Sequence, residues 1–311
     1  MKFQITHWFL FFAILFSGCS STKKVITLKD NAAEIKVLIV NGQNNHNWKI
    51  GSNSLQKIME GSGLFTVAIA TSPEKGKDMS GFKPNFQAFD VVVMDYNGDE
   101  WCDEMKTSFV NYVRNGGGLV IFHAADNSFP KWKEYNQMIG LGGWGQRNES
   151  AGPYVYMQDD GKIIRDNSLG KGGSHGPQHD YTVKTRKPNH PIMKGLPEEW
   201  LHAKDELYHG LRGPAENMTI LATAYSDTTF KGTGRHEPAL MTINYGKGRV
   251  FHTIMGHASE ANLPMKCAGF IVTFLRGTEW AATGKVKQAI PEKLPSKTEV
   301  CLWEDYKNSN Q

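Results

Sequence analysis

The fold is decided by the stretch Gly116-Gly117-Gly118-Leu119-Val120-Ile121-Phe122-His123-Ala124-Ala125-Asp126-Asn127. Glycines just after a helix favour the left-handed cap conformation. A short apolar run bounded by such residues is typical of a fully buried strand, usually a parallel one. His123 is therefore expected at the carboxyl end of a strand, where ligands bind in open α/β sheets. The simpler alternative is a histidine that caps the strand through a local hydrogen bond.

The composition is that of a globular protein. The chain has 311 residues, of which 40% are hydrophobic and 21% are charged, and this length suits one large domain or two small ones. The net charge of +4 is scattered, and no basic run is longer than two residues, as in Lys23-Lys24. A nucleic-acid partner is therefore not expected.

The N-terminus carries a targeting signal. Lys2 precedes an apolar run over residues 8–16, which is too short for a membrane span and predicts a signal peptide over residues 1–18. Cys19 directly after Ser17-Gly18 resembles a bacterial lipobox, so we expect Cys19 to be lipidated and residues 19–34 to form a tether. The domain would then be lipid-anchored, periplasmic or at the cell surface. A soluble secreted protein is the alternative.

The other cysteines do not predict a disulfide framework. Cys102, Cys267 and Cys301 are odd in number, and no pair has the spacing of metal ligands. We expect buried thiols.

Strands and helices alternate in the first half of the domain. Strands are expected over residues 35–40, 65–70 and 89–96, and helices over 52–60 and 100–115. This alternation predicts right-handed crossovers and a parallel sheet. The central strand with His123 follows, so polar residues end each strand at one edge of the sheet.

The second half begins with an aromatic, glycine-rich segment over residues 128–173, with one short helix expected over 131–139. Such a segment forms either a lid over the strand ends or a packed surface excursion with a small core of its own. Further strands are expected over 180–184 and 218–225, and a hairpin over 239–254. A final helix over 263–275 is expected to end at Arg276-Gly277, before a polar tail that runs to residue 311.

Three histidines follow predicted strands at the same edge of the sheet. His46 lies after the first strand, His123 after the central strand and His257 after the last. The adjacent acids Asp205 and Glu206 point to different sides of a strand or helix, so at most one of them faces a site.

Other histidines are less informative. His202 is expected at the surface. His175 and His179 have helix-face spacing, but the glycines and the proline around them argue against a preformed metal pair.

Histidines and a carboxylate at one sheet edge support two chemical schemes. They can bind a divalent metal such as Zn²⁺ with one position open for water. They can also act without metal, as an acid–base pair on a sugar or carbonyl substrate. The chain lacks a P-loop and a G-x-G-x-x-G after a strand, and its G-x-S-x-G match at residues 172–176 does not follow a predicted strand, so nothing favours a serine nucleophile or a dinucleotide.

An ordered set of short motifs resembles the ThuA-like (trehalose utilisation) family. The motifs are the segment 37–48, the stretch 116–123, His190-Pro191-Ile192, Asp205-Glu206-Leu207-Tyr208, and the segment 246–251 that leads to Gly256-His257. The resemblance covers residues 35–283, which would form one domain, and residues 284–311 would be a C-terminal tail.

The resemblance implies a flavodoxin-like α/β fold of the class I glutamine amidotransferase superfamily, a mostly parallel sheet with helices on both faces. The catalytic cysteine of those relatives would stand where this chain has His123, so glutamine amidotransferase activity is not expected. The implied substrates are trehalose and related sugars, including 3-keto glycosides. The implied catalytic or metal-binding residues are His123, Glu206 and His257. The predicted substrate contacts are His46, Trp48, Asp126, Tyr208 and Asp205.

The sequence therefore predicts a membrane-anchored enzyme that acts on a small carbohydrate. The second hypothesis is a sugar-binding lipoprotein without activity, whose aromatic residues stack on sugar rings. The third is a scaffold that has lost amidotransferase activity and binds a partner protein.

Overall fold

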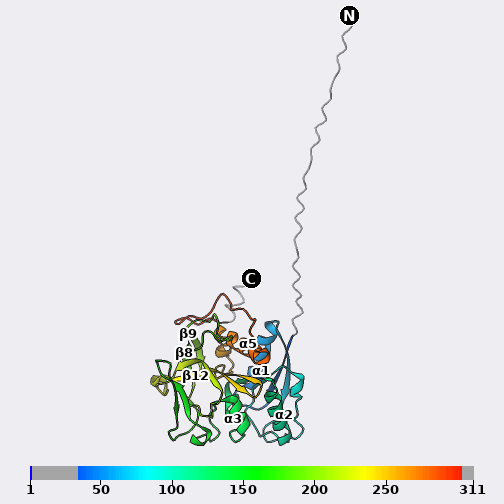
Figure 1. Cartoon of the computed structure of the whole chain (residues 1–311), viewed down its shortest axis with the longest axis vertical. Helices are drawn as coiled ribbons and strands as arrows, with labels where there is room; N and C mark the ends of the chain where they lie inside the picture. Colours follow the sequence, from blue (N-terminus) through cyan, green and yellow to red (C-terminus); the bar gives the residue numbers. More distant parts are fainter. Residues whose placement is uncertain (2–33, 303–311) are drawn as a thin grey trace. The chain divides into compact units, whose positions relative to one another are not determined.

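The computed structural model describes Met1 and residues 34–302 (Figure 1). The predicted signal peptide, Cys19 and the predicted tether lie outside the described residues, apart from Met1 and Glu34.

One large sheet forms the centre of the domain. Its parallel part contains, in spatial order, β2 (Phe65–Thr71), β1 (Ile35–Asn41), β3 (Val91–Met94), β4 (Gly118–Phe122) and β13 (Gly248–Thr253). Its antiparallel part continues with β12 (His236–Tyr245), β11 (Met218–Tyr225), β8 (His179–Thr185) and β9 (Glu199–Asp205). The hairpin of β5 (Tyr154–Met157) and β6 (Ile163–Asp166) pairs with β12, and β7 (Ser174–His175) pairs separately with β10 (Tyr208–His209).

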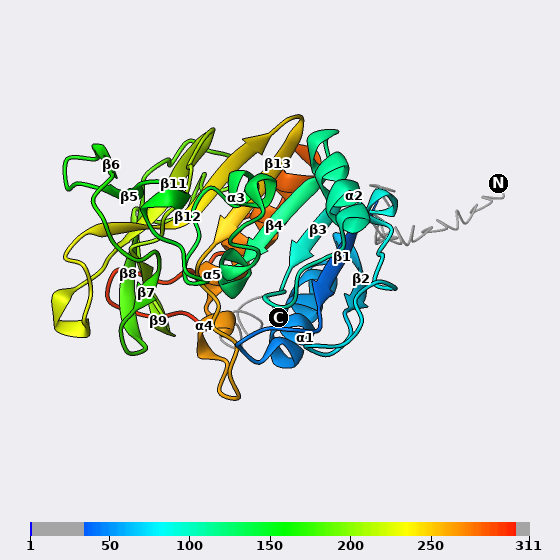
Figure 2. The same ribbon diagram turned by 90° about the horizontal axis from the view of Figure 1, so that it is seen from below.

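Helices cover both faces of the parallel part (Figures 1 and 2). The helix α1 (Trp48–Gly61) and the long helix α5 (Ala268–Thr283) pack on one face, and α2 (Asp103–Arg114) and α3 (Lys133–Ile139) lie on the other. A short helix, α4 (Leu263–Lys266), precedes α5. Every residue of β3 and β4 is buried, as expected for strands covered on both sides.

The predicted α/β fold class is confirmed. The strands and helices of the first half all form, as do β11 and the β12–β13 hairpin. The strand β9 was not predicted, because its burial does not follow apolar character: the polar residues His202 and Asp205 lie inside. The pairing of β7 with β10 joins residues far apart in the sequence, which no local pattern indicates.

The final helix does not end where the sequence suggested. It breaks at Cys267 and then continues through Arg276 and Gly277 to Thr283, where Gly284 provides a left-handed cap with φ +74°. Gly277 is needed inside the helix because a Cβ there would overlap the ring of Phe251 in β13.

The aromatic segment contributes mainly to the core. Trp132 and Tyr135 are buried and stack on each other, with ring centroids 5.6 Å apart. Trp144 is half-buried and contacts Tyr208 instead.

Beyond α5, residues 284–302 are not a free tail. Ser296 accepts a hydrogen bond from Leu201, and Cys301 accepts one from Ala268. Cys267 and Cys301 are buried, as predicted, and Cys102 is half-buried.

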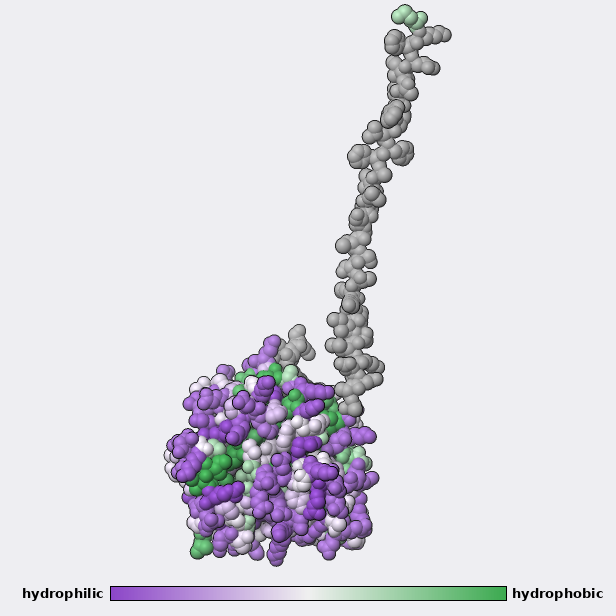
Figure 3. Space-filling view, viewed as in Figure 1, coloured by the Kyte–Doolittle hydropathy of each residue, from purple (hydrophilic) through white to green (hydrophobic). Residues whose placement is uncertain are grey.

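Among residues 34–302, no helix is both long enough and apolar enough to cross a bilayer. The face of the domain that Figure 3 displays is predominantly hydrophilic.

Gly277→Ala should destabilise the domain by about 1–3 kcal/mol, because the added methyl group overpacks the contact between α5 and Phe251. Gly61→Ala is the matched control. Gly61 ends α1 with open space around it, so alanine should be neutral or stabilise by about 0.4–1 kcal/mol. Urea unfolding of the two variants measures both effects, and equal midpoints would contradict the proposed packing role of Gly277.

Candidate metal and sugar site

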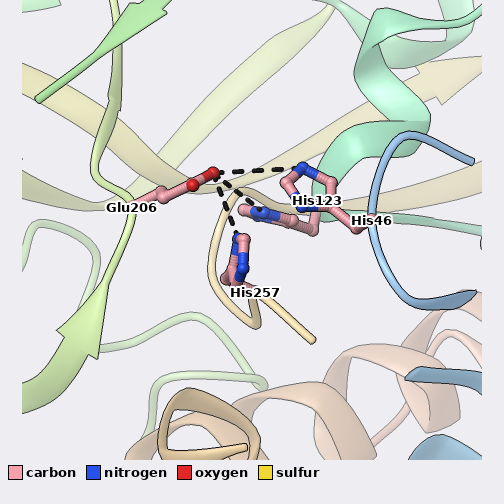
Figure 4. A group of neighbouring side chains, drawn as sticks. All are labelled: His46, His123, Glu206 and His257. Atoms are coloured by element: carbon pink, nitrogen blue, oxygen red, sulfur yellow. Dashed lines mark ion pairs between the residues drawn. The ribbon is translucent and has the colours of Figure 1, made fainter. Parts of the chain in front are cut away.

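Four side chains converge at the carboxyl ends of the parallel strands (Figure 4). His46 follows β1, His123 follows β4 and His257 follows β13, while Glu206 lies between β9 and β10 in the other half of the domain. Their ligand atoms all lie within 4.8 Å of one another. Glu206 Oε2 is 3.9 Å from His46 Nε2, 3.8 Å from His123 Nε2 and 3.2 Å from His257 Nδ1.

His123 is held in an unusual backbone conformation. Its φ is +44°, which is rare for a residue with a side chain. His123 follows the strand directly and is the first residue of a 3₁₀ turn over His123–Asn127. The ring is buried, and its Nδ1 lies 2.5 Å from the carbonyl oxygen of Ile254. Since the Nδ1–H donates to that carbonyl, Nε2 presents a lone pair to the cluster.

His46 is positioned by polar residues of the first loop. Its backbone N–H donates to Asn44 Oδ1, and the Asn44 amide donates to the buried carboxyl of Asp95 at the end of β3. Burial raises the pKa of Asp95 to about 7. Burial, together with the neighbouring imidazoles of His123 and His257, lowers the pKa of His46 to about 3. Burial likewise lowers the pKa of His123, so both rings are neutral at pH 7.

Asp205 is a positioning residue behind the cluster. Its Oδ2 accepts hydrogen bonds from His202 Nε2 at 2.8 Å and from the Gly256 N–H at 2.7 Å. Its Oδ1 accepts from the N–H groups of Glu206 and His257, at 2.8 and 3.1 Å. One buried carboxylate therefore joins the loop after β13 to the segment that carries Glu206.

His202 supplies the charge opposite Asp205. Although burial opposes an imidazolium, the hydrogen bond to Asp205 raises the pKa of His202 to about 10. Burial also opposes the charge of Asp205, but His202 lowers the pKa of Asp205 below its usual value. The pair is therefore ionised at pH 7, and both side chains are fully buried.

Glu206 is ionised and incompletely satisfied. Burial opposes its charge, yet the imidazoles of His257 and His123 lower the pKa of Glu206. Burial would lower the pKa of His257, but the Glu206 carboxylate raises it. Glu206 Oε2 and His257 Nδ1 face each other at 3.2 Å, but neither atom makes a hydrogen bond. Two buried polar atoms at this distance, without a hydrogen bond, have about the separation of two ligands of one cation.

Tyr208 and His175 extend the cluster. The Tyr208 hydroxyl lies 3.0 Å from His46 Nε2 and 3.1 Å from His123 Nε2, and its ring stacks on His123. His175 lies beside Tyr208 through the pairing of β7 with β10, and its Nε2 is 3.8 Å from Glu206 Oε2. The His175 side chain is 37% exposed, so it lies at the open side of the cluster.

A cavity of about 390 Å³ opens above these residues. It is lined by Asn45, His46, Asn97, Asn127, Trp144, Gly145, His175, Glu206 and Tyr208. Amide side chains and aromatic rings of this kind are the groups that bind a small polar ligand.

The structure brings together His46, His123, Glu206, His257 and Tyr208, all of which the sequence nominated. Asp205 and Glu206 do point to different sides, and only Glu206 faces the cavity. Trp48 begins α1 and does not line the cavity, and Asp126 is fully buried 3.6 Å from His252 Nε2. Asp205 is also fully buried and does not line the cavity. The expectation that these three side chains contact substrate has no support in the cavity lining.

The expectation that His202 lies at the surface is wrong, because its imidazole is buried in an ion pair with Asp205. His175 and the cavity asparagines were not nominated. Only the position of Asn45 and Asn97 after strands could have indicated them, whereas His175 depends on a long-range pairing.

The fold and the cluster define an α/β domain with a three-histidine, one-carboxylate site at a parallel sheet edge. The model of the ThuA family, described as trehalose utilisation, matches residues 36–281, so the chain belongs to this family. The crystal structure of a ThuA-like protein from Parabacteroides merdae is 53% identical over 88% of this chain and 99% of its own, with a TM-score of 0.85.

A second ThuA-like protein, from Bacteroides uniformis, shares the fold at 18% identity, with a TM-score of 0.53 over 81% of this chain and 93% of its own. No curated protein matches the sequence.

Asp205→Asn should destabilise the protein by about 3–5 kcal/mol at pH 7, because it leaves the His202 imidazolium buried without its partner. A raised histidine pKa stabilises the fold fully below pH 6.5, and this stabilisation is lost as the pH rises through about 10. The cost of the substitution should therefore shrink from pH 7 to pH 10. Chemical unfolding at several pH values measures it.

Asp159→Asn is the matched control. Asp159 also lies 2.8 Å from a histidine, His236, but its side chain is 95% exposed. Its replacement should cost about 0–1 kcal/mol. An equal cost for the two variants would contradict the role assigned to Asp205.

Proposed function

We propose that this protein is a carbohydrate-active enzyme that binds one divalent metal ion, Zn²⁺, through His46, His123, His257 and Glu206. The observation that carries the proposal is the convergence of four donor atoms, two of which lack any hydrogen bond although they are buried.

The geometry of the cluster fits such an ion. Ligand atoms held about 2.0–2.2 Å from a tetrahedral Zn²⁺ are separated by about 3.3–3.6 Å. The distances from Glu206 Oε2 to the three imidazole nitrogens, 3.2–3.9 Å, bracket this range. Small side-chain rotations would therefore complete the coordination.

The chemistry of the donors fits as well. Burial keeps His46 and His123 neutral, so their lone pairs are available, and Glu206 supplies a negative charge. The carbonyl of Ile254 fixes the His123 tautomer, as is usual for metal-bound histidines. Asp205 holds the backbone of both Glu206 and His257, which fixes two of the four ligands.

A Zn²⁺ ion held by these four side chains would supply Lewis-acid polarisation to a carbonyl or hydroxyl oxygen of the substrate that binds as an additional ligand. The chain's own residues then orient the substrate. The amides of Asn45, Asn97 and Asn127 offer both donors and acceptors to sugar hydroxyls. His175 lies at the open side and can exchange hydrogen bonds with the substrate.

Membership of the trehalose utilisation family and the polar cavity support a sugar substrate, of the trehalose or 3-keto-glycoside type. None of the residues that line the cavity is a cysteine, in keeping with chemistry other than that of an amidotransferase.

A metal-free sugar-binding protein is the second candidate. The observation in its favour is the Tyr208 hydroxyl, which lies within hydrogen-bond distance of both His46 and His123 without any ion. Measurements of bound metal and of turnover separate the two candidates.

Purified wild-type protein should contain about one Zn²⁺ per chain, and Glu206→Gln and His123→Ala should lose most of it. Incubation with ordinary and 3-keto glucosides should give product with wild type, and turnover should fall at least about 100-fold in both variants. His236→Ala, which removes a histidine outside the cluster, is the control and should keep both metal and turnover.

Stoichiometric metal is measured by mass spectrometry, and product by chromatography. A metal-free wild type whose turnover is unaffected by chelators would contradict the metal. Binding of these sugars without any turnover would instead support the second candidate.

We also propose that Cys19 carries a lipid that anchors the domain to a membrane. In cells fed labelled palmitate, wild type should be labelled and found with membranes, whereas Cys19→Ser should be unlabelled. Cys102→Ser removes a cysteine of the domain and should behave like wild type. An unlabelled wild type in the soluble fraction would overturn the anchor.

A further inference from the structure

A second cavity adjoins the first. Its volume is about 440 Å³, and it shares Trp144 and Gly145 with the first cavity. Its other lining residues are Gln146, Arg147, Asn148, Lys171, Gly172 and Gly173. None of them belongs to the histidine–glutamate cluster, so this space has no role in holding the ion.

The wall between the two cavities is rigidly built. Trp144 has a φ of +50°, its N–H donates to the carbonyl of Gly172, and its carbonyl accepts from the N–H of Arg147. Gly173 must be glycine because a Cβ there would overlap Gly143 and the backbone of Trp144. The two glycine-rich segments therefore pack backbone to backbone and fix the indole in place.

The buried guanidinium of Arg147 secures this wall. It donates hydrogen bonds to the carbonyls of Asn127, Gly143 and Ser128 and to the side chain of Asn136. Its Nε, Nη1 and Nη2 atoms all have protein partners, so Arg147 does not act as an anion receptor. Lys171 is then the one cationic side chain of the lining that faces solvent, which disfavours a phosphorylated or other strongly anionic ligand.

The other side chains that line the second cavity have groups that suit a sugar ring. Gln146 is an exposed amide that offers donors and an acceptor to hydroxyl groups. Asn148 is also exposed; its Oδ1 accepts hydrogen bonds from Ser150, and its NH₂ group offers donors to a hydroxyl group. The half-buried indole of Trp144, with one side against Tyr208 at 4.7 Å between ring centroids, provides an apolar surface for the C–H face of a pyranose. Each cavity is near the lower end of the roughly 300–1,000 Å³ typical of small-molecule sites, which suits one sugar unit in each.

We infer that the second cavity is a subsite for the second sugar ring of a disaccharide, whose glycosidic linkage passes beside Trp144 and Gly145, the residues that line both cavities. This inference rests on the proposed function, because it takes the first ring to lie beside Glu206. The residues that recognise the second ring are then Gln146, Asn148 and Lys171, and they do not touch the metal ligands.

Calorimetric titration of the purified full-length protein tests the subsite. The ligands are trehalose and methyl α-glucoside, each in ordinary and 3-keto form, so that a one-ring and a two-ring ligand are compared. One of the two forms, ordinary or 3-keto, will bind more tightly. In that form, wild type should bind the disaccharide at least tenfold more tightly than the methyl glycoside. The double variant Gln146→Ala/Asn148→Ala should lose that tenfold preference and keep the affinity for the methyl glycoside within twofold.

Asn97→Ala, in the first cavity, is the matched control and should weaken both ligands alike. Equal affinity of wild type for one and two rings would overturn the subsite and leave the proposed function intact. Equal weakening of both ligands by the double variant, or no weakening of either, would also overturn it. If wild type binds none of the four sugars, the proposed function fails and the subsite fails with it.

Discussion

The site depends on the hydrogen bonds that the buried Asp205 carboxylate accepts. Glu206 comes from the antiparallel half of the sheet and His257 from the parallel half, and Asp205 holds the backbone of both. An isolated carboxylate in this position would be expensive to bury. Here three backbone N–H groups and the His202 imidazolium satisfy both oxygens, so the burial is offset and the geometry is fixed. Two distant strands thus present their ligand atoms to one point, which neither strand could do alone.

Sequence patterns predicted the parts of this arrangement that depend on local structure. Buried strands followed by polar residues placed His46, His123 and His257 at one edge, because the carboxyl ends of parallel strands meet there. Glu206 and Tyr208 came from the family resemblance. The burial of His202 and the place of His175 could not be predicted, since the first depends on an ion pair inside the fold and the second on the pairing of β7 with β10. The extent of α5 was missed because Gly277 resembles a helix end, although it is required by contact with Phe251.

Under the proposed function, His123 gives this turn a chemistry other than that of the amidotransferases that the resemblance implies as relatives. The resemblance places their catalytic cysteine at this turn, where the chain passes from a buried strand into a 3₁₀ turn and the residue takes a positive φ. That conformation costs free energy and projects the side chain over the strand ends. A cysteine there can act as a nucleophile. A histidine whose Nδ1–H is held by a backbone carbonyl presents a lone pair instead, which suits a metal or a proton. The backbone turn positions the side chain over the strand ends, and the type of side chain determines the chemistry.

The two halves of the domain differ in what they contribute to the site. The parallel half supplies three imidazoles from strand ends that are packed between helices, so their positions tolerate little change. The glycine-rich segment between β4 and β8 supplies the walls of the second cavity and part of those of the first. Arg147, close backbone contacts and the pairing of β5 with β12 hold it in place. An exposed residue on that segment without such contacts, such as Gln146, can therefore be exchanged without disturbing the cluster. Under the proposed function, ligand preference can change in this segment while the reactive centre, held by Asp205 and the strand ends, remains constant.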